Sequence, residues 1–176
     1  SDTHLMRESG GQLMGIDTDR SLAAVCRLVA AQSPIDALLL TGDLAGDESE
    51  EAYGRLHEAL APLGVPSFWL PGNHDAVWSN DHRLRSHFKR MVQLPHWDIL
   101  MLNTQYPGVV AGHLAGPEIE ALEQAVDHAQ TTGRPLLVAT HHPLMPVDCA
   151  WLDEIGAENA REALRRLAPL GEKAVV

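Results

Sequence analysis

The feature that most constrains this sequence is a series of short apolar runs separated by segments with helical periodicity. Runs of this length, with little polar alternation, are typical of strands that are buried on both faces. They lie at residues 37–40, 65–70, 98–102 and 136–139, and a further run begins at residue 173. Because strands and helices alternate along most of the chain, the sequence predicts an α/β layered domain.

The segments between these runs carry helix signals. Ser49 predicts an N-cap, with Tyr53, Leu56 and Leu60 as the buried stripe behind it. Gly116-Pro117 predicts a helix start, because proline is tolerated best in the first turn. In total we expect helices at residues 22–29, 49–63, 81–91, 116–126 and 160–167.

The charge and the cysteines narrow the class of partner and compartment. The chain has 176 residues and a formal net charge of −11, which disfavours duplex DNA and anionic membranes as partners. No apolar run approaches the roughly 18 residues of a membrane span, and the N-terminus shows no signal-peptide core. Cys26 and Cys149 have no metal-binding spacing, so we predict a reducing, cytoplasmic location.

Polar residues with metal-binding chemistry follow the predicted strands. In open α/β sheets, ligands gather beyond the carboxyl ends of strands. Oxygen and imidazole ligands suit divalent Mn, Fe or Zn, and the absence of cysteine argues against a structural zinc site. The four motifs are Asp2-Thr3-His4, Thr41-Gly42-Asp43, Gly72-Asn73-His74-Asp75 and Thr140-His141-His142-Pro143.

Each short motif alone has an ordinary alternative. Asp2 and His4 can be a solvated tail, Gly42-Asp43 a turn, and His141-His142 a loop. The Gly72-Asn73-His74-Asp75 tetrapeptide is the more specific signal, and four such motifs in order disfavour coincidence.

The spacing of these residues suits a shared metal site. In extended chain, Asp2 and His4 project to the same face, because they are two residues apart. A carboxylate such as Asp43 has enough lone pairs to bridge two cations. His74 can protonate a leaving oxygen or hold a phosphate, with Asp75 orienting it.

These motifs resemble those of the calcineurin-like metallophosphoesterases, and within them the bacterial class III cyclic-nucleotide phosphodiesterases. The finer likeness includes Cys149-Ala150-Trp151-Leu152-Asp153, Gly112-x-Leu114 and Asn159-Ala160. The resemblance implies a four-layer α/β/β/α sandwich of two mixed sheets flanked by helices. It also implies a single domain over residues 1–176, incomplete at both ends, because the first strand and the family's Gly-His-x-His motif are absent.

The resemblance assigns a role to each site residue. It implies that Asp2 and His4 bind the first of two divalent metal ions, and that Asp43 bridges both. Asn73 and His141 bind the second ion, and Asn73 also lies on the substrate side. His74 contacts the phosphate or assists the leaving group. For His142 two roles stay open, one at the rim of the substrate pocket and one in stabilising the loop.

The implied reaction is hydrolysis of a small phosphodiester, with 3',5'-cyclic AMP converted to 5'-AMP as the leading substrate. A broader phosphodiesterase or phosphomonoesterase, acting on glycerophosphodiesters or lipid-linked nucleotides, is the first alternative. A catalytically inactive fragment or scaffold of the same fold is the second. We expect no nucleic-acid polymer or membrane as partner, and keep a homodimer as a candidate assembly. Trp78, Trp97 and Trp151 are candidate base-stacking residues, with core or surface packing as the alternative.

Overall fold

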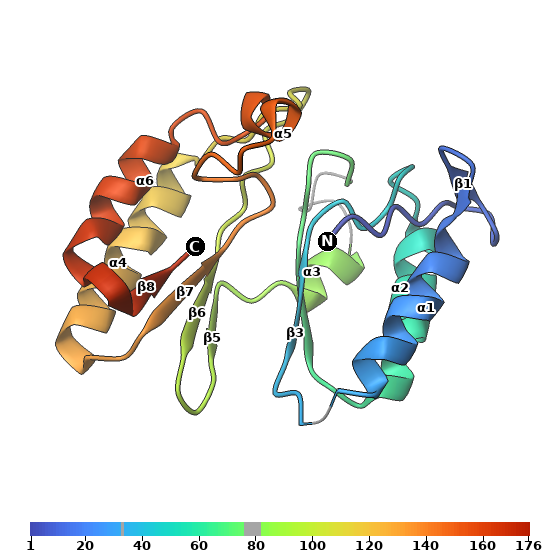
Figure 1. Ribbon diagram of the computed structural model, residues 1–176, viewed down its shortest axis with the longest axis horizontal. Coiled ribbons are helices and arrows are strands. Elements are labelled where there is room, and N and C mark those ends of the chain that lie inside the picture. The colour runs from blue at the N-terminus through green and yellow to red at the C-terminus, as the bar shows by residue number, and fades with distance from the viewer. Residues whose placement is uncertain (33, 76–81) are drawn as a thin grey trace. The chain divides into compact units, whose positions relative to one another are not determined.

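The computed structural model describes residues 1–32, 34–75 and 82–176. The chain divides into two compact units, Ser1–Phe88 and Lys89–Val176, which we call the N-terminal and C-terminal units. In Figure 1 the first runs from blue to green and the second from yellow-green to red. Each unit is described by itself.

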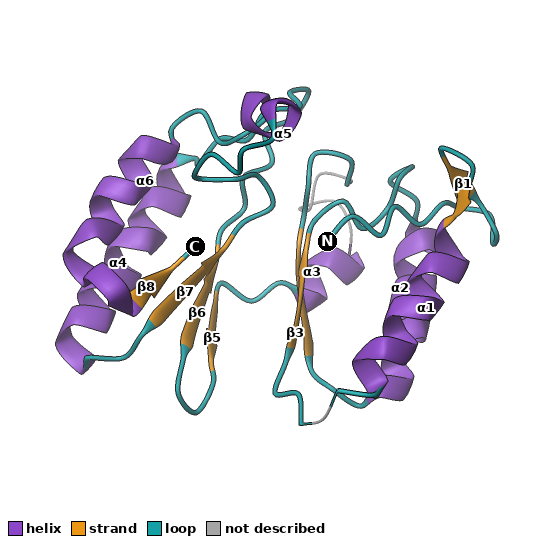
Figure 2. Ribbon diagram, in the orientation of Figure 1, coloured by secondary structure: helices purple, strands orange, loops and turns teal. Residues whose placement is uncertain are grey.

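The described residues of the N-terminal unit form a small hairpin, a parallel pair of strands and three α-helices; Figure 2 shows these helices and strands by colour. The strands β3 and β4 pair in register, with Thr41 opposite Leu70, so both strands end at the same edge. In chain order the elements are β1 (Gln12–Leu13), β2 (Ile16–Asp17), α1 (Thr18–Ala30), β3 (Leu38–Thr41), α2 (Glu50–Leu60), the 3-10 helix Ala61–Leu63, β4 (Ser67–Leu70) and α3 (His82–His87).

The two long helices of this unit each begin with an N-cap residue whose side chain accepts a hydrogen bond from the first turn. The Ser49 side chain accepts a hydrogen bond from the backbone N–H of Ala52, which confirms the predicted N-cap of α2. Asp17 caps α1 in the same way through the N–H of Arg20. Helices α1 and α2 contact each other, and Tyr53 and Leu56 of α2 are fully buried with Trp69 of β4.

Strand β3 differs from its prediction. We expected it to be buried on both faces, but Leu38 and Leu39 are only half-buried and Leu40 alone is buried. A cavity of about 400 Å³ lies along the strand, and these leucines line it together with Leu22 and Val25 of α1. Leu38 and Leu40 still belong to the core of this unit or pack against it, but the cavity leaves the strand less buried than the apolar run predicts.

The C-terminal unit is a four-stranded mixed sheet with helices (Figure 2). Its strand order is β5-β6-β7-β8; β6, β7 and β8 are parallel, and β5 is antiparallel to β6. Helices α4 and α6 contact each other, and α4 also packs on β6 and β7. The elements are β5 (Met91–Gln93), β6 (Asp98–Met101), α4 (Gly116–Thr132), β7 (Leu136–Ala139), α5 (Ala150–Glu154), α6 (Ala160–Leu167), the 3-10 helix Ala168–Lys173 and β8 (Ala174–Val175).

The predicted α/β class is confirmed, since strands and helices alternate in both units. The helix expected at residues 81–91 is shorter: α3 ends at His87 and β5 follows, while Asp81 lies outside the described residues. The sequence analysis missed the hairpin β1–β2, strand β5 and the five-residue helix α5. That residues 1–176 form one domain stays a prediction. Among the described residues, every helix is too short or too polar to cross a bilayer.

Candidate metal-binding site

The loops after β3 and β4 leave the same edge of the strand pair and contact each other. The first contains Gly42 and Asp43, and the second contains Asn73, His74 and Asp75. The backbone N–H of His74 donates to Asp43 Oδ1 at 2.9 Å, so the carboxylate of one loop is held by the backbone of the other. Asp43 is only 4% exposed, Asn73 is half-buried and His74 is exposed.

The first residues of the chain run beside the β3 loop. The backbone N–H of Asp2 donates to the Gly42 carbonyl at 2.9 Å, and that of His4 donates to the Asp43 carbonyl at 3.0 Å. Next, the N–H of Leu5 donates to the Leu44 carbonyl at 3.0 Å. This pairing places the first predicted motif against the second.

Two carboxylates flank one imidazole at this point. His4 Nε2 lies 3.7 Å from Asp2 Oδ1 and 3.5 Å from Asp43 Oδ2. The hydrogen bond with Asp2 and the negative charges of Asp43 and Asp2 raise the pKa of His4, although burial acts in the opposite direction. The His74 ring meets the His4 ring edge-on, with centroids 5.2 Å apart. The structure therefore groups Asp2, His4, Asp43 and His74.

The backbone reaches this arrangement by a route that the sequence did not predict. We expected Asp2 and His4 to share a face because the chain is extended there. Instead Asp2, His4 and Asp43 have φ values of 59°, 42° and 53°, in the left-handed region. Residues other than glycine reach this region at a cost of about 1–3 kcal/mol each, and such strain concentrates at functional sites. The side chains meet because the backbone turns, and not because they alternate along a strand.

Asp75 lies beneath the two loops and is 2% exposed. Its carboxylate accepts hydrogen bonds from the backbone N–H groups of Leu44, Ala45 and Gly72 and from the Tyr53 hydroxyl, at 2.9–3.1 Å. Burial raises the pKa of Asp75, and these hydrogen bonds act in the opposite direction. That Asp75 orients His74 stays a prediction, whereas its contacts with both loops are observed.

In the C-terminal unit, His141 and His142 follow β7 as predicted. His142 is 1% exposed; its Nδ1 lies 2.7 Å from the Thr104 hydroxyl and its Nε2 lies 3.0 Å from the Val110 carbonyl. Because a carbonyl oxygen only accepts, Nε2 must carry a proton, and in the neutral ring Nδ1 accepts from the Thr104 hydroxyl. Both ring nitrogens are thus engaged, which favours the loop-stabilising role over the substrate-binding one. His141 is half-buried.

The loop that His142 holds explains two further motifs. A Cβ atom at Gly112 would lie 2.5 Å from the His142 ring, so this position has no room for a side chain. The Asn159 side chain bonds both the N–H and the carbonyl of Leu114, at 2.9 and 2.8 Å. This packing gives a physical reason for the Gly112-x-Leu114 and Asn159-Ala160 motifs.

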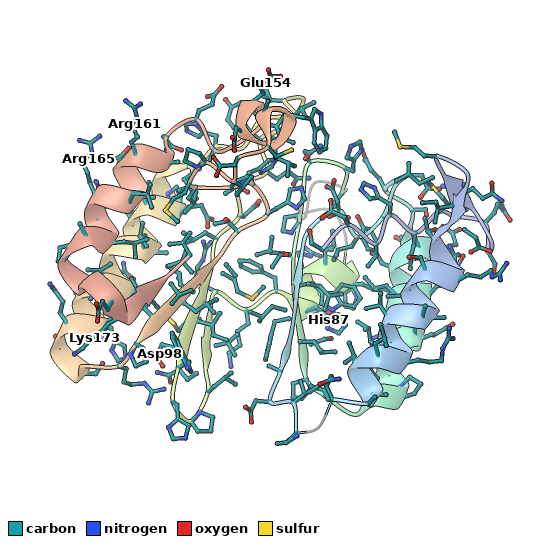
Figure 3. The ribbon with its side chains drawn as sticks, viewed as in Figure 1. His87, Asp98, Glu154, Arg161, Arg165 and Lys173 are labelled. Carbon is teal, nitrogen blue, oxygen red and sulfur yellow. The ribbon has the colours of Figure 1, made fainter. Side chains whose placement is uncertain are left out.

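The candidate stacking residues lie in different places. Trp97 precedes β6 and so lies at the amino ends of the parallel strands β6 and β7, whereas the His141 loop follows their carboxyl ends. Trp151 is 66% exposed on α5, which lies at the other end of the unit (Figure 1); Figure 3 marks Glu154 on the same helix. Trp78 lies outside the described residues. The sequence predicted Tyr53 only as part of a buried stripe and gave no sign of its hydrogen bond to Asp75, nor of the role of Thr104, since a hydroxyl in a helix or loop carries no motif.

The donor set of the N-terminal unit fits a divalent cation. Asp2, His4 and Asp43 offer oxygen and imidazole ligands, which suit hard or borderline metals. A cation between them would balance two carboxylates that lie near one imidazole. The strained backbone fixes these ligands close together, and no cysteine takes part.

Comparison with known proteins identifies the class. A family model described as calcineurin-like phosphoesterase matches residues 1–171, and the chain belongs to this family. The family resemblance drawn from the sequence is confirmed. This fold implies divalent metal ions.

Particular relatives are similar along most of the chain. It is 36% identical to the 3',5'-cyclic adenosine monophosphate phosphodiesterase CpdA of Pseudomonas aeruginosa, covering 96% of this chain and 62% of the relative. It is 38% identical to CpdA of Escherichia coli (strain K12), covering 92% of this chain and 60% of the relative. The chain thus spans less than two thirds of these relatives' length. A dimetal phosphatase from Danio rerio shares the fold, with a TM-score of 0.73, 12% identity, and coverage of 96% of this chain and 75% of that one.

Proposed function

We propose that the protein hydrolyses 3',5'-cyclic AMP to 5'-AMP with the help of two divalent metal ions. The observation that carries this proposal is the grouping of Asp2, His4 and Asp43 at the carboxyl edge of β3 and β4. The names of the similar bacterial phosphodiesterases support the substrate. Manganese, iron and zinc all suit this donor set.

The family motifs complete the proposed ligand set. Asp2 and His4 would hold the first ion, both ions would share Asp43, and Asn73 would hold the second. His141 is proposed as a further ligand of the second ion on the strength of its motif alone. Divalent cations in such sites act as Lewis acids on the phosphate and supply a hydroxide at neutral pH.

His74 is the proposed group for the leaving oxygen. Its side chain is exposed beside the carboxylates, and its own backbone N–H is fixed by Asp43. The oxygen of water would form a bond to phosphorus and the water would lose one proton to solvent, while the P–O3' bond breaks and O3' takes a ring proton from His74. His74 and Asn73 also lie where they can hold phosphate oxygens, and Asp75 keeps their loop in place.

The partners and compartment follow from the charge and the cysteines. A net charge of −11 disfavours polyanions, so the proposed substrate is a small phosphate ester and not a nucleic-acid polymer or a membrane. Cys26 and Cys149 are both free thiols, which supports a reducing, cytoplasmic location. A homodimer stays part of the proposal.

The test compares two substrates and one variant. Purified protein reconstituted with Mn²⁺, Fe²⁺ or Zn²⁺ is given cyclic AMP and glycerophosphocholine, and product is followed by chromatography. We expect 5'-AMP to form only with metal and to be lost in Asp43→Asn. Faster hydrolysis of glycerophosphocholine would favour the broader phosphodiesterase. Fewer than about one metal ion bound per chain, with no hydrolysis, would favour the inactive scaffold, because a dinuclear site needs two.

A further inference from the structure

The buried carboxylate of Asp75 connects the two loops that carry the proposed ligands. Asp75 Oδ1 accepts from Leu44 N at 3.0 Å and from Ala45 N at 2.9 Å, directly after Asp43 in the β3 loop. Its Oδ2 accepts from Gly72 N at 2.9 Å in the β4 loop. One carboxylate thus bonds the backbones of both loops.

A carboxylate from each loop accepts hydrogen bonds from the backbone of the other loop. Asp43 Oδ1 accepts from the backbone N–H of His74, and Asp75 accepts from the backbone N–H groups that follow Asp43. Helix α2 adds the Tyr53 hydroxyl, 3.0 Å from Asp75 Oδ1, and Tyr53 is fully buried. The Asp43 backbone, with its positive φ, is therefore held from both sides.

We propose that Asp75 is a positioning residue that sets the metal affinity of the site by locking the backbones of residues 42–45 and 72–75 together. This inference rests on the proposed function, because it assumes that Asp43 and Asn73 bind metal. Asp75 acts through those backbones and touches neither metal nor substrate. It differs from the expected role, in which Asp75 orients the His74 ring.

The backbone N–H groups around residue 75 require a side chain that only accepts hydrogen bonds. The three backbone N–H groups that Asp75 binds can only donate, so an ionised carboxylate suits this place. Asparagine has almost the same shape, but its NH₂ group would face an N–H donor in either orientation. Asp75→Asn therefore breaks the lock with a minimal change in packing.

The experiment measures Mn²⁺ binding by calorimetry, together with thermal unfolding, for the wild type and three variants. We expect Asp75→Asn to weaken Mn²⁺ binding by about 10- to 100-fold, the usual effect of losing a residue that supports metal ligands. Asp75→Glu, which keeps a carboxylate, should recover part of this loss. Leu60→Ala is the control, because Leu60 is buried at the far end of α2 from Tyr53. It should lower the melting temperature and leave the Mn²⁺ affinity unchanged.

Amide hydrogen exchange supplies a second readout without metal. The N–H groups of Leu44, Ala45 and Gly72 should exchange faster in Asp75→Asn than in Leu60→Ala. Wild-type Mn²⁺ affinity in Asp75→Asn, or an equal loss in Leu60→Ala, would overturn the proposal. If Asp75→Asn does not fold, Tyr53→Phe takes its place, and an unchanged Mn²⁺ affinity there overturns it too.

The exchange readout separates the two proposals. A wild type that binds none of Mn²⁺, Fe²⁺ and Zn²⁺ refutes the proposed function. Unchanged exchange at those three amides in Asp75→Asn refutes the lock itself.

Discussion

Two loops of this molecule each carry a more exposed residue followed by a buried one, but the buried residues form different kinds of hydrogen bonds. In the N-terminal unit, exposed His74 is followed by buried Asp75; in the C-terminal unit, half-buried His141 is followed by buried His142. In each pair the first residue is the proposed functional group and the second bonds neighbouring loop segments. Asp75 accepts from donors only, whereas His142 both donates and accepts. The type of the second residue in such a pair therefore depends on the hydrogen-bond donors and acceptors that surround its side chain.

The largest effect on turnover should come from the first residue of the N-terminal pair, His74. His74→Ala should slow turnover by about 10²–10⁴, the usual scale for loss of a general acid. Metal content and melting temperature should stay near those of the wild type, because the His74 side chain is exposed. Steady-state kinetics with metal analysis checks this. Full activity in this variant would show that the proposed role is wrong.

The second residue of the C-terminal pair should matter mainly for stability. His142→Ala removes a buried ring and leaves Thr104 and the Val110 carbonyl without it, so we expect a loss of about 2–4 kcal/mol in the free energy of unfolding. Urea unfolding measures this. A stable His142→Ala protein with weakened substrate binding would instead support the pocket-rim role.

A smaller effect is expected from the glycine that faces His142. Gly112→Ala would place a methyl group 2.5 Å from a ring that hydrogen bonds hold in place. The loop must shift, and we expect a loss of about 1–3 kcal/mol. Gly108→Ala is not a matched control, because Gly108 has positive φ, but Gly116 has open space around its Cβ position. Gly116→Ala should therefore leave the unfolding free energy within about 0.5 kcal/mol of the wild type.

The smallest effect concerns a histidine away from both pairs. His87 stacks on Trp69, and burial lowers its pKa, assisted by the charge of His57 and opposed by the Ser67 carbonyl. A lowered pKa in the folded state means that the neutral ring is favoured by folding. Its contribution is therefore present above the unfolded value of 6.5 and is lost as the pH falls through the folded value.

The melting temperatures at pH 7.5 and pH 5 test this sign. The wild type should lose more stability between them than His87→Phe, which keeps an aromatic ring on Trp69 and cannot titrate. We expect a difference of less than about 1 kcal/mol, because the ring is partly solvated. An equal loss in both proteins would assign the pH effect to other groups.

Local sequence determined much of this molecule. Ser49 and Gly116-Pro117 marked helix starts, and the runs at residues 98–102 and 136–139 marked strands, because capping and apolar periodicity act over a few residues. The motifs with Asp43, His74 and His141 were visible for the same reason, as polar residues at strand exits.

Tertiary structure decided how those motifs are supported. Tyr53 reaches Asp75 across 22 residues, and Thr104 reaches His142 across 38, and no local pattern encodes such partners. The left-handed backbone at Asp2, His4 and Asp43 is likewise strained on its own and persists only because segments distant in sequence bond to it. The amino-acid sequence alone was enough to predict which residues belong to the proposed metal site, since residue type is a local property. Their geometry depends on buried hydrogen bonds between distant segments, which exist only once the chain has folded.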